Sequence, residues 1–191
     1  MTEYLIPHLK NLRNQVVLKH YNKGEYKGMF MLSCGNAYRS MVECAGGVTV
    51  VGLSTSAPFP EGKALEDRFY SKEEVESMYP GWFNATPGML DDEVMEELGG
   101  AYLEVLRGLG YSDEPLMVPV GSGETIVSLS SRMPKESLIG FTTENYPPIR
   151  LDYSHLADRL LNGYTLVFLR EIGEARRMAK DENVSIVVTW L

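Results

Sequence analysis

The fold is decided by a stretch of ten residues that reads Leu116-Met117-Val118-Pro119-Val120-Gly121-Ser122-Gly123-Glu124-Thr125. Its first half is apolar and contains two β-branched valines, which predicts a buried strand. Two glycines around a serine follow, and residues 126–132 have the pattern of a helix. A strand, a glycine-rich turn and a helix in this order predict a βα unit whose turn lies at the carboxyl end of a strand.

The turn itself has the composition of a phosphate cradle. Glycines permit backbone conformations denied to other residues, and successive N–H groups at a helix N-terminus converge on an anion. Ser122 and Thr125 add hydroxyl donors. No lysine follows the second glycine, and Ile126 stands where a dinucleotide-binding loop needs its third glycine, so neither of those motifs is present. We predict that residues 121–125 bind a phosphate; the alternative is a tight turn without a ligand.

Strand and helix patterns alternate on both sides of this unit. They predict an α/β fold with an open, mainly parallel sheet and helices on both faces, in three layers. Strands are expected at residues 28–33, 48–53, 116–120, 137–141 and 184–188, and helices at 8–20, 38–44, 91–108, 126–132, 152–161 and 171–180. Residues 165–168 are a further apolar run.

Residues 54–90 interrupt the alternation. They contain Pro58, Pro60, Pro80 and Pro87 together with several aromatic residues, which predicts a long irregular insertion with one short helix near residues 72–77. Such an insertion either covers a site or wraps the surface, and both readings stay open. The length of 191 residues predicts a single domain over residues 1–191.

Composition excludes several classes of partner. The net charge of −8 argues against non-specific binding to nucleic acid or to an anionic membrane. No signal peptide and no apolar run of roughly 18 residues is present, so a cytoplasmic protein is expected. No zinc-type spacing of cysteine and histidine occurs, so no metal is expected. A homodimer is plausible, because a small sheet domain can bury its aromatic residues against a copy of itself.

A second candidate loop, Ser33-Cys34-Gly35-Asn36, also follows a predicted strand and precedes a helix. Ligands of open parallel sheets bind at such strand ends. The helix N–H groups suit a carboxylate and the Asn36 amide suits a ring oxygen; alternatively, Asn36 only caps the helix. Tyr38 and Arg39 are candidates to face a substrate, Arg39 as a partner for a carboxylate, and surface exposure is the alternative for both.

The order of these two loops resembles that of the fold type II pyridoxal-phosphate enzymes, the group of tryptophan synthase β, cysteine synthase, threonine synthase and ACC deaminase, in a shortened form. Those enzymes hold the substrate carboxylate and touch the cofactor ring with a Ser-x-Gly-Asn-type loop. A later Gly-Ser/Thr-Gly-Gly-Thr-type loop holds the cofactor phosphate. The resemblance implies cofactor binding by Ser33, Gly35, Asn36 and residues 121–125, and substrate binding by Cys34. Glu124 departs from the pattern, since it puts a carboxylate where the family has glycine.

The C-terminal stretch carries the same resemblance. Residues 171–179 and the following Glu182-Asn183-Val184 are similar to the late helix of the family and its lead into the next strand. In the family that strand ends near a Ser or Thr that faces the pyridine nitrogen, which implies this role for Thr189.

The family also needs a lysine that binds the cofactor aldehyde and moves protons. In the ACC deaminase branch it lies in an Asn-Lys-x-Arg-Lys-Leu-type segment, to which residues 9–14 are similar, so Lys10 is the candidate. Lys19, Lys23 and Lys27 are weaker alternatives. The other reading of Lys10 is a solvated lysine on an amphipathic helix whose apolar face holds Leu9, Leu12, Val16 and His20.

The resemblance implies a pyridoxal-phosphate enzyme that acts on an amino acid by lyase, deaminase or β-replacement chemistry. A second hypothesis is an inactive descendant that binds a phosphorylated ligand or a partner protein. A third is a sugar-phosphate isomerase-like enzyme, which needs a carboxylate and a lysine near the cradle; Asp152 and Lys135 are the candidates. The first hypothesis expects the turns near residues 35 and 123 on the same rim of one sheet.

Overall fold

The computed structural model describes residues 1–7, 9–33, 35–55, 62–144 and 155–189. These residues form two compact units, one of residues 10–94 and one that joins residues 1–9 to residues 95–190. The single domain expected from the chain length stays a prediction, because the compactness of each unit does not test it.

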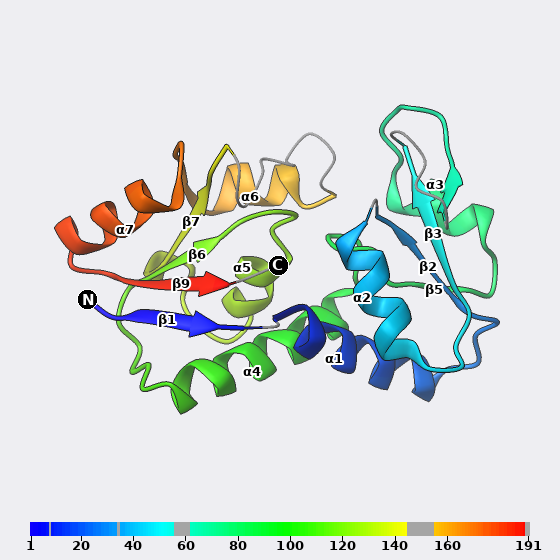
Figure 1. Ribbon diagram of the computed structural model, residues 1–191, viewed down its shortest axis with the longest axis horizontal. Coiled ribbons are helices and arrows are strands. Elements are labelled where there is room, and N and C mark those ends of the chain that lie inside the picture. The colour runs from blue at the N-terminus through cyan, green and yellow to red at the C-terminus, as the bar shows by residue number, and fades with distance from the viewer. Residues whose placement is uncertain (8, 34, 56–61, 145–154, 190–191) are drawn as a thin grey trace. The chain divides into compact units, whose positions relative to one another are not determined.

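The unit of residues 1–9 and 95–190 contains a five-stranded sheet in which every neighbouring pair is parallel (Figure 1). In sheet order its strands are β1 (Glu3–Ile6), β9 (Ser185–Thr189), β6 (Leu116–Pro119), β7 (Leu138–Thr142) and β8 (Thr165–Phe168). Strands β6 and β9 are interior strands of this sheet, which explains why they read as apolar runs rather than as alternations.

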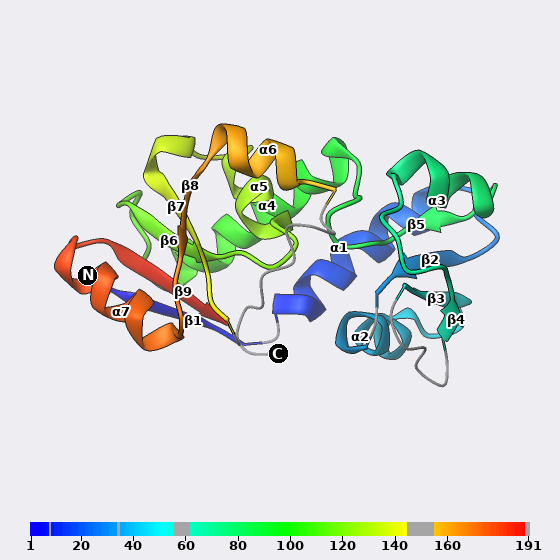
Figure 2. The same ribbon diagram turned by 90° about the horizontal axis from the view of Figure 1, so that it is seen from above.

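Helices cover both faces of this sheet (Figure 2). On one face lies α7 (Ile172–Asp181), whose Ala175 and Ala179 pack with Met117 and Phe141. The other face carries α5 (Glu124–Ser130) and α4 (Asp92–Gly108), of which the residues from Met95 onward belong to this unit. The unit is completed by the 3-10 helix η1 (Lys135–Ser137) and by α6 (Ala157–Gly163).

The unit of residues 10–94 contains a four-stranded parallel sheet. In sheet order its strands are β4 (Gly62–Ala64), β3 (Val50–Ser54), β2 (Met29–Leu32) and β5 (Phe83–Asn84). The helices α2 (Asn36–Ala45) and α3 (Lys72–Met78) lie on opposite faces of it (Figure 2). Helix α1 (Leu9–Lys23) belongs to this unit from Lys10 onward.

Helix α3 begins with a capping box. The Ser71 hydroxyl accepts the N–H of Glu74 at 3.1 Å, and the Glu74 carboxylate accepts the N–H of Ser71 at 3.3 Å. The cap directs Val75 of α3 into a buried cluster with Phe30 and Leu53 of the sheet. The helix expected near residues 72–77 is therefore confirmed, and it closes one face of this unit.

The predicted α/β class with parallel strands flanked by helices is confirmed, but the strands are divided between two sheets. Residues 54–90 are not simply irregular, because β4 and β5 pair with β3 and β2. The two candidate loops do not share the rim of one sheet, since β2 and β6 belong to different sheets. Strand β1 was not expected from the sequence at all.

The amino-terminal edge of the five-stranded sheet is held together by Glu114. Its carboxylate accepts hydrogen bonds from the hydroxyl of Tyr4 on β1, from the hydroxyl of Ser185 on β9 at 3.1 Å and from the N–H of Ser112 at 2.9 Å. Burial alone would raise the pKa of this carboxyl, but the hydrogen bonds from Tyr4, Ser112 and Ser185 outweigh it and lower the pKa to about 2. The group is therefore an ionised acceptor at neutral pH that joins the starts of three strands.

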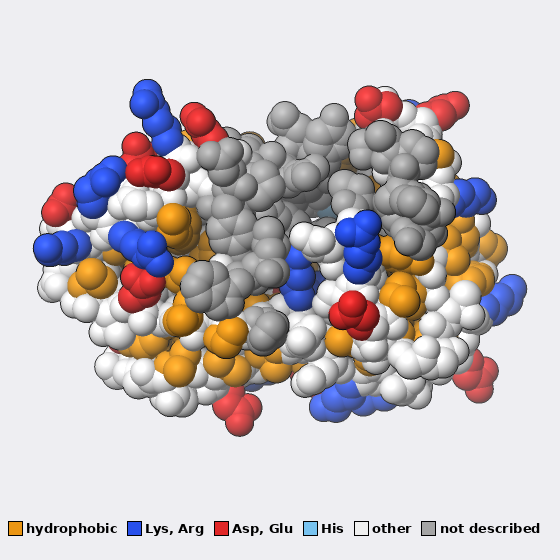
Figure 3. Space-filling view, viewed as in Figure 1, with side chains coloured by type: hydrophobic (Ala, Val, Ile, Leu, Met, Phe, Trp, Pro, Cys, Tyr) orange, Lys and Arg blue, Asp and Glu red, His pale blue; other side chains and the backbone are white. Residues whose placement is uncertain are grey.

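Surface charge is mixed on the face of the molecule that Figure 3 shows. Lys and Arg side chains lie beside Asp and Glu side chains on the face seen in Figure 3. Among the described residues, no helix is both long enough and apolar enough to cross a membrane.

Candidate functional site

The glycine loop lies where the sequence predicts it, between β6 and α5. The β6 ladder continues to Val120, whose N–H donates to the carbonyl of Phe141 at 2.8 Å. Gly123 then takes φ 87° and ψ 2°, a left-handed conformation that suits glycine, and directly precedes α5. A Cβ on Gly123 would lie 2.3 Å from a methyl carbon of buried Leu160, so packing as well as conformation selects glycine here.

The loop presents donors for which the described part of the chain offers no acceptor. Within the described residues, the N–H groups of Gly123 and Thr125 have no acceptor, and neither does the Thr125 hydroxyl. The Ser122 hydroxyl accepts the N–H of Glu124 at 3.4 Å. A Cβ added at Gly121 would meet no atom of the described residues within 4 Å, so the loop is open to them at that residue. Converging donors beside open space are what an anion requires.

Glu124 does not place its charge in the loop. Its side chain is 5% exposed and accepts hydrogen bonds from the hydroxyl of Tyr102 on α4 at 3.0 Å and of Ser128 on α5 at 3.2 Å. The carboxylate is thus turned into the packing between two helices. The departure from the family pattern noted in the sequence is therefore compatible with an anion at the loop.

Two threonines end the strands on either side of β6. Thr189 is the last residue of β9 and pairs with Ile6 of β1. Thr142 ends β7, is fully buried, and its hydroxyl has no hydrogen-bond partner in the described part of the chain. Because neighbouring parallel strands end at the same edge, both residues belong to the edge that carries the glycine loop.

The asparagine loop follows β2 in the other unit. The N–H of Ser33 donates to the carbonyl of Leu53 at 3.0 Å, which extends the β2 ladder by one residue. Gly35 has φ 128°, a value that favours glycine, and precedes α2 without a side-chain cap. Asn36 is the first residue of α2 and not its N-cap, which is Gly35, and it is exposed.

The other candidates around this loop, Tyr38 and Arg39, differ in their exposure to solvent. Tyr38 is 8% exposed and belongs to the buried face of α2, so it does not present its ring to solvent. Arg39 is exposed. Cys34 lies outside the described residues. Of the expected substrate-facing residues, Arg39 is the one whose exposure leaves it accessible.

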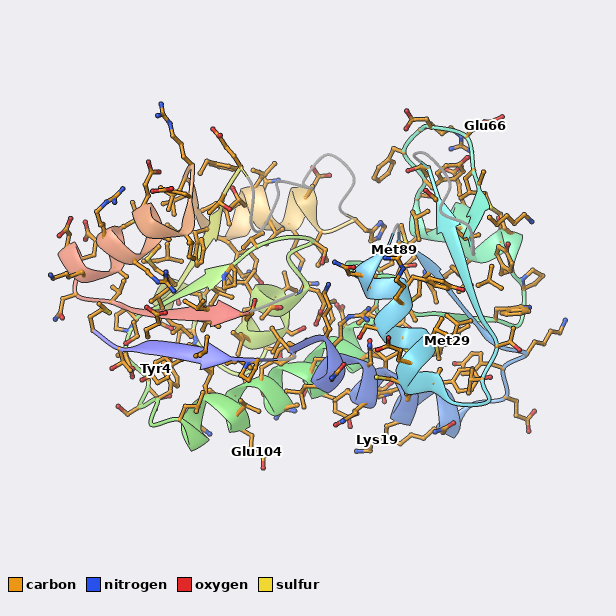
Figure 4. All side chains as sticks on the ribbon, viewed as in Figure 1. Tyr4, Lys19, Met29, Glu66, Met89 and Glu104 are labelled. Carbon is orange, nitrogen blue, oxygen red and sulfur yellow. The ribbon has the colours of Figure 1, made fainter. Side chains whose placement is uncertain are left out.

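Lys10 lies in the first turn of α1 and is partly buried. Burial lowers the pKa of its amine, and the positive charge of Arg13 lowers it further. The apolar face expected for this helix is wrong in part, because the helix buries Arg13 and Asn14 together with Val16 and Val17. The position of Lys10 beside buried polar residues separates it from exposed Lys19 and Lys23 on the same helix (Figure 4 labels Lys19).

Sequence reasoning missed three buried polar residues that support this part of the molecule. Arg13 donates to the carbonyl of Ala85 at 2.7 Å, and Asn14 donates to the hydroxyl of Ser40 on α2 at 2.9 Å. Thr86 accepts the N–H of Leu32 at 2.9 Å, directly before the asparagine loop. The signal that could have found them is the Arg13-Asn14 pair on the expected helix, since buried polar side chains in a helix need partners on other elements.

The lysine that the isomerase-like alternative requires, Lys135, does not lie near the glycine loop. Lys135 precedes β7, at the amino-terminal edge of the sheet, and its ammonium lies 5.0 Å from the centre of the Tyr164 ring. The glycine loop follows the carboxyl end of β6, which is parallel to β7, so Lys135 and the loop lie at opposite edges. Asp152 lies outside the described residues. No cluster of three metal-ligating side chains occurs in the described ranges.

No protein-family model and no curated protein matches the sequence. Solved structures do. A threonine deaminase from T.th. is 14% identical with a TM-score of 0.55, over 94% of this chain and 81% of that one. O-ureido-L-serine synthase is 13% identical with a TM-score of 0.56, over 95% and 78%.

A cysteine synthase from Entamoeba histolytica is 12% identical with a TM-score of 0.57, over 98% of this chain and 78% of that one. These alignments include both compact units of the chain. Cysteine synthase belongs to the enzyme group that the order of the two loops resembles. The chain therefore has the fold of the type II pyridoxal-phosphate enzymes.

Proposed function

We propose that the chain is a pyridoxal-phosphate enzyme that acts on an amino acid by elimination, deamination or β-replacement. The observation that carries the proposal is the glycine loop at the carboxyl end of β6, with left-handed Gly123 and donors that have no acceptor within the described residues. The likeness in fold to an amino-acid deaminase and to two synthases supports the same class.

The residues present fit the phosphate of this cofactor. An anion needs converging N–H donors, room beside them and no competing carboxylate. The loop has donors at Gly123 and Thr125, open space at Gly121, and a Glu124 side chain that is engaged by Tyr102 and Ser128. When bound, pyridoxal phosphate supplies an aldehyde that takes up amines and a ring that accepts electrons from the substrate α-carbon.

The remaining roles are those that the resemblance to the fold type II enzymes implies, and they are assigned within each compact unit separately. Residues 121–125 would hold the phosphate, and the Thr189 hydroxyl would hold the pyridine nitrogen. Ser33, Gly35 and Asn36 would bind the cofactor ring and the substrate carboxylate, with Arg39 as a second carboxylate partner. Lys10 would bind the aldehyde and take or return the α-proton, which requires that its amine be neutral part of the time. The lowered pKa of Lys10 supports that assignment.

Reduction with borohydride tests the proposal. Purified protein mixed with pyridoxal phosphate is expected to show an absorbance band near the edge of the visible range, and borohydride should fix one phosphopyridoxyl group onto Lys10, mapped by peptide mass spectrometry. Lys10→Arg should abolish the band and the label, whereas the matched Lys19→Arg on the exposed side of the same helix should keep both (Figure 4).

The same experiment decides between this function and simple ligand binding. Thermal stabilisation by pyridoxal phosphate and by inorganic phosphate, without any band or labelled lysine, would assign the chain to the inactive descendants that bind a phosphorylated ligand. If the phosphopyridoxyl group is found on Lys23 or Lys27 and not on Lys10, the proposed enzyme class stands and that residue is the lysine that binds the aldehyde. No stabilisation and no label would leave a protein-binding role.

A further inference from the structure

Arg13 is a buried, positively charged residue three positions after Lys10 on helix α1. It is 6% exposed, and its guanidinium donates to the carbonyl of Ala85 at 2.7 Å and to the amide oxygen of Asn14 at 3.2 Å. Ala85 follows β5 and is itself tied to the sheet, because its N–H donates to the carbonyl of Phe30 at 2.9 Å. The guanidinium is therefore anchored to the end of a strand rather than free to turn outward.

Asn14, the next residue, fixes the same helix to a different element. Its amide donates to the hydroxyl of Ser40 on α2 at 2.9 Å, and that hydroxyl donates to Asn11 of α1 at 3.4 Å. Helix α1 is thus joined to the end of β5 by Arg13 and to α2 by Asn14. These contacts all lie inside one compact unit.

The separation of three residues along α1 places the anchored Arg13 charge near Lys10. Residues three apart on a helix are neighbours on its surface, so Arg13 lies one turn from Lys10 on the same side. Among the described residues, Arg13 is the charged group whose field acts on the Lys10 amine, and burial acts in the same direction. No carboxylate of the described ranges offsets it at that amine.

We propose that Arg13 is a positioning residue for Lys10: its anchored guanidinium holds the first turn of α1 in place and keeps a fixed positive charge beside the amine, which favours the neutral, nucleophilic form of that amine. The inference rests on the proposed function in assigning Lys10 as the reacting lysine. It deepens that function by naming what prepares the amine for attack on an aldehyde. An arginine suits the task because it stays charged at any pH the protein meets.

Competitive amine labelling tests the inference on the protein alone, without cofactor. The protein is labelled with trace acetic anhydride between pH 6 and pH 11, and the extent at Lys10 is read by mass spectrometry against exposed Lys23 of the same helix. Arg13→Gln keeps a donor for the Ala85 carbonyl but removes the charge, and Arg13→Lys keeps the charge. Ser40→Ala loosens the α1–α2 contact without touching any charge. Far-UV circular dichroism and urea unfolding establish that each variant is folded over this pH range.

We expect the labelling midpoint of Lys10 to rise by about half a pH unit in Arg13→Gln, the size expected of one like charge a helical turn away in a partly solvated site. This corresponds to about threefold slower labelling at pH 7. Arg13→Lys and Ser40→Ala should leave the midpoint within about 0.2 of the parent value, and Lys23 should not move in any variant.

An unchanged midpoint in Arg13→Gln would overturn the inference, and so would an equal rise in Arg13→Gln and Arg13→Lys. If Arg13→Gln fails to fold, Arg13→Lys decides, and a shift of the Lys10 labelling midpoint in that variant overturns the inference. If Arg13→Lys fails to fold, a rise of the midpoint in Arg13→Gln that is absent from Ser40→Ala supports the inference. A parent protein that takes up no pyridoxal phosphate would refute the proposed function and leave the titration of Lys10 readable, so the two failures are distinguishable.

Discussion

The two edges of the five-stranded sheet treat their polar groups in opposite ways. At the amino-terminal edge, the Glu114 carboxylate accepts hydrogen bonds from Tyr4, Ser112 and Ser185, and the Tyr111 hydroxyl donates to the Glu114 carbonyl at 3.0 Å. At the carboxyl-terminal edge, the Thr142 hydroxyl and the N–H groups of Gly123 and Thr125 have no partner within the described residues. One edge pairs its polar groups with one another, and the other leaves donors that the described residues do not satisfy, as the proposed phosphate site requires.

The largest effect is expected where the carboxyl-terminal edge is most tightly packed. Gly123→Ala adds a methyl group 2.3 Å from a Leu160 methyl carbon and forces a left-handed conformation on alanine. Crowding and backbone strain together should cost about 3 kcal/mol of unfolding free energy, measured by urea denaturation.

Gly121→Ala is the matched control for that substitution. Its Cβ would meet no atom of the structurally described residues within 4 Å, and Gly121 is not among those of them with positive φ. A change below about 0.5 kcal/mol is expected. Equal losses in the two variants would show that the loop is not shaped around Gly123.

Substitutions of Glu124 test whether the hydrogen bonds from Tyr102 and Ser128 to its carboxylate stabilise the glycine loop. Glu124→Ala removes the acceptor that receives the hydroxyls of Tyr102 and Ser128 in a buried position, and we expect a loss of about 2 kcal/mol. Glu124→Gln keeps an acceptor oxygen and should lose less than half of that. Phosphate affinity, measured by calorimetry, should fall in Glu124→Ala more than in Glu124→Gln; a gain in Glu124→Ala would mean that the carboxylate opposes the anion.

The amino-terminal edge has its own test in Glu114→Gln. The partly solvated carboxylate should contribute about 1 kcal/mol at neutral pH, with screening included. Because its folded pKa of about 2 lies below its ordinary value of 4.5, this stabilisation is present above pH 4.5 and is lost as the pH falls toward 2. Urea denaturation between pH 7 and pH 2 should show that the difference in unfolding free energy between parent and variant shrinks as the pH falls. A difference that stays constant would mean that the charge of Glu114 does not cause the stabilisation.

Thr142→Val is expected to give the smallest effect, with the opposite sign. It replaces a buried hydroxyl that lacks a partner in the described part of the chain, so the variant should be about 0.5 kcal/mol more stable. Thermal denaturation can detect this change. A loss of more than about 1 kcal/mol would mean that the hydroxyl is satisfied in solution and that the contrast between the edges is smaller than described.

The sequence predicted those parts of the fold that rest on local patterns. Strands β6 and β9 are apolar runs, and the glycine loop is recognisable from its own residues. Strand β1 was missed because Leu5, which is 44% exposed, stands between buried Tyr4 and Ile6 and hides the alternation. Strands β4 and β5 have three and two residues, so pairing with their neighbours and not their own pattern makes them strands.

The parts of the site that escaped prediction depend on residues far apart in the chain. The direction of the Glu124 side chain is set by Tyr102, 22 positions earlier. The burial of Arg13 is set by Ala85, 72 positions later. A helical pattern that counts only apolar residues cannot find such a buried cation, because its partners lie on other elements.

The inward turn of Glu124 has a consequence for anyone who redesigns this loop. A glycine at this position, as in the loop pattern that the sequence resembles, would leave the electrostatics at the proposed anion site nearly as they are, since the carboxylate already points elsewhere. It would, however, detach α4 from the start of α5 and give the first helical turn a residue with no side chain to anchor it. A consensus substitution here would loosen the scaffold without making the cradle more attractive to anions.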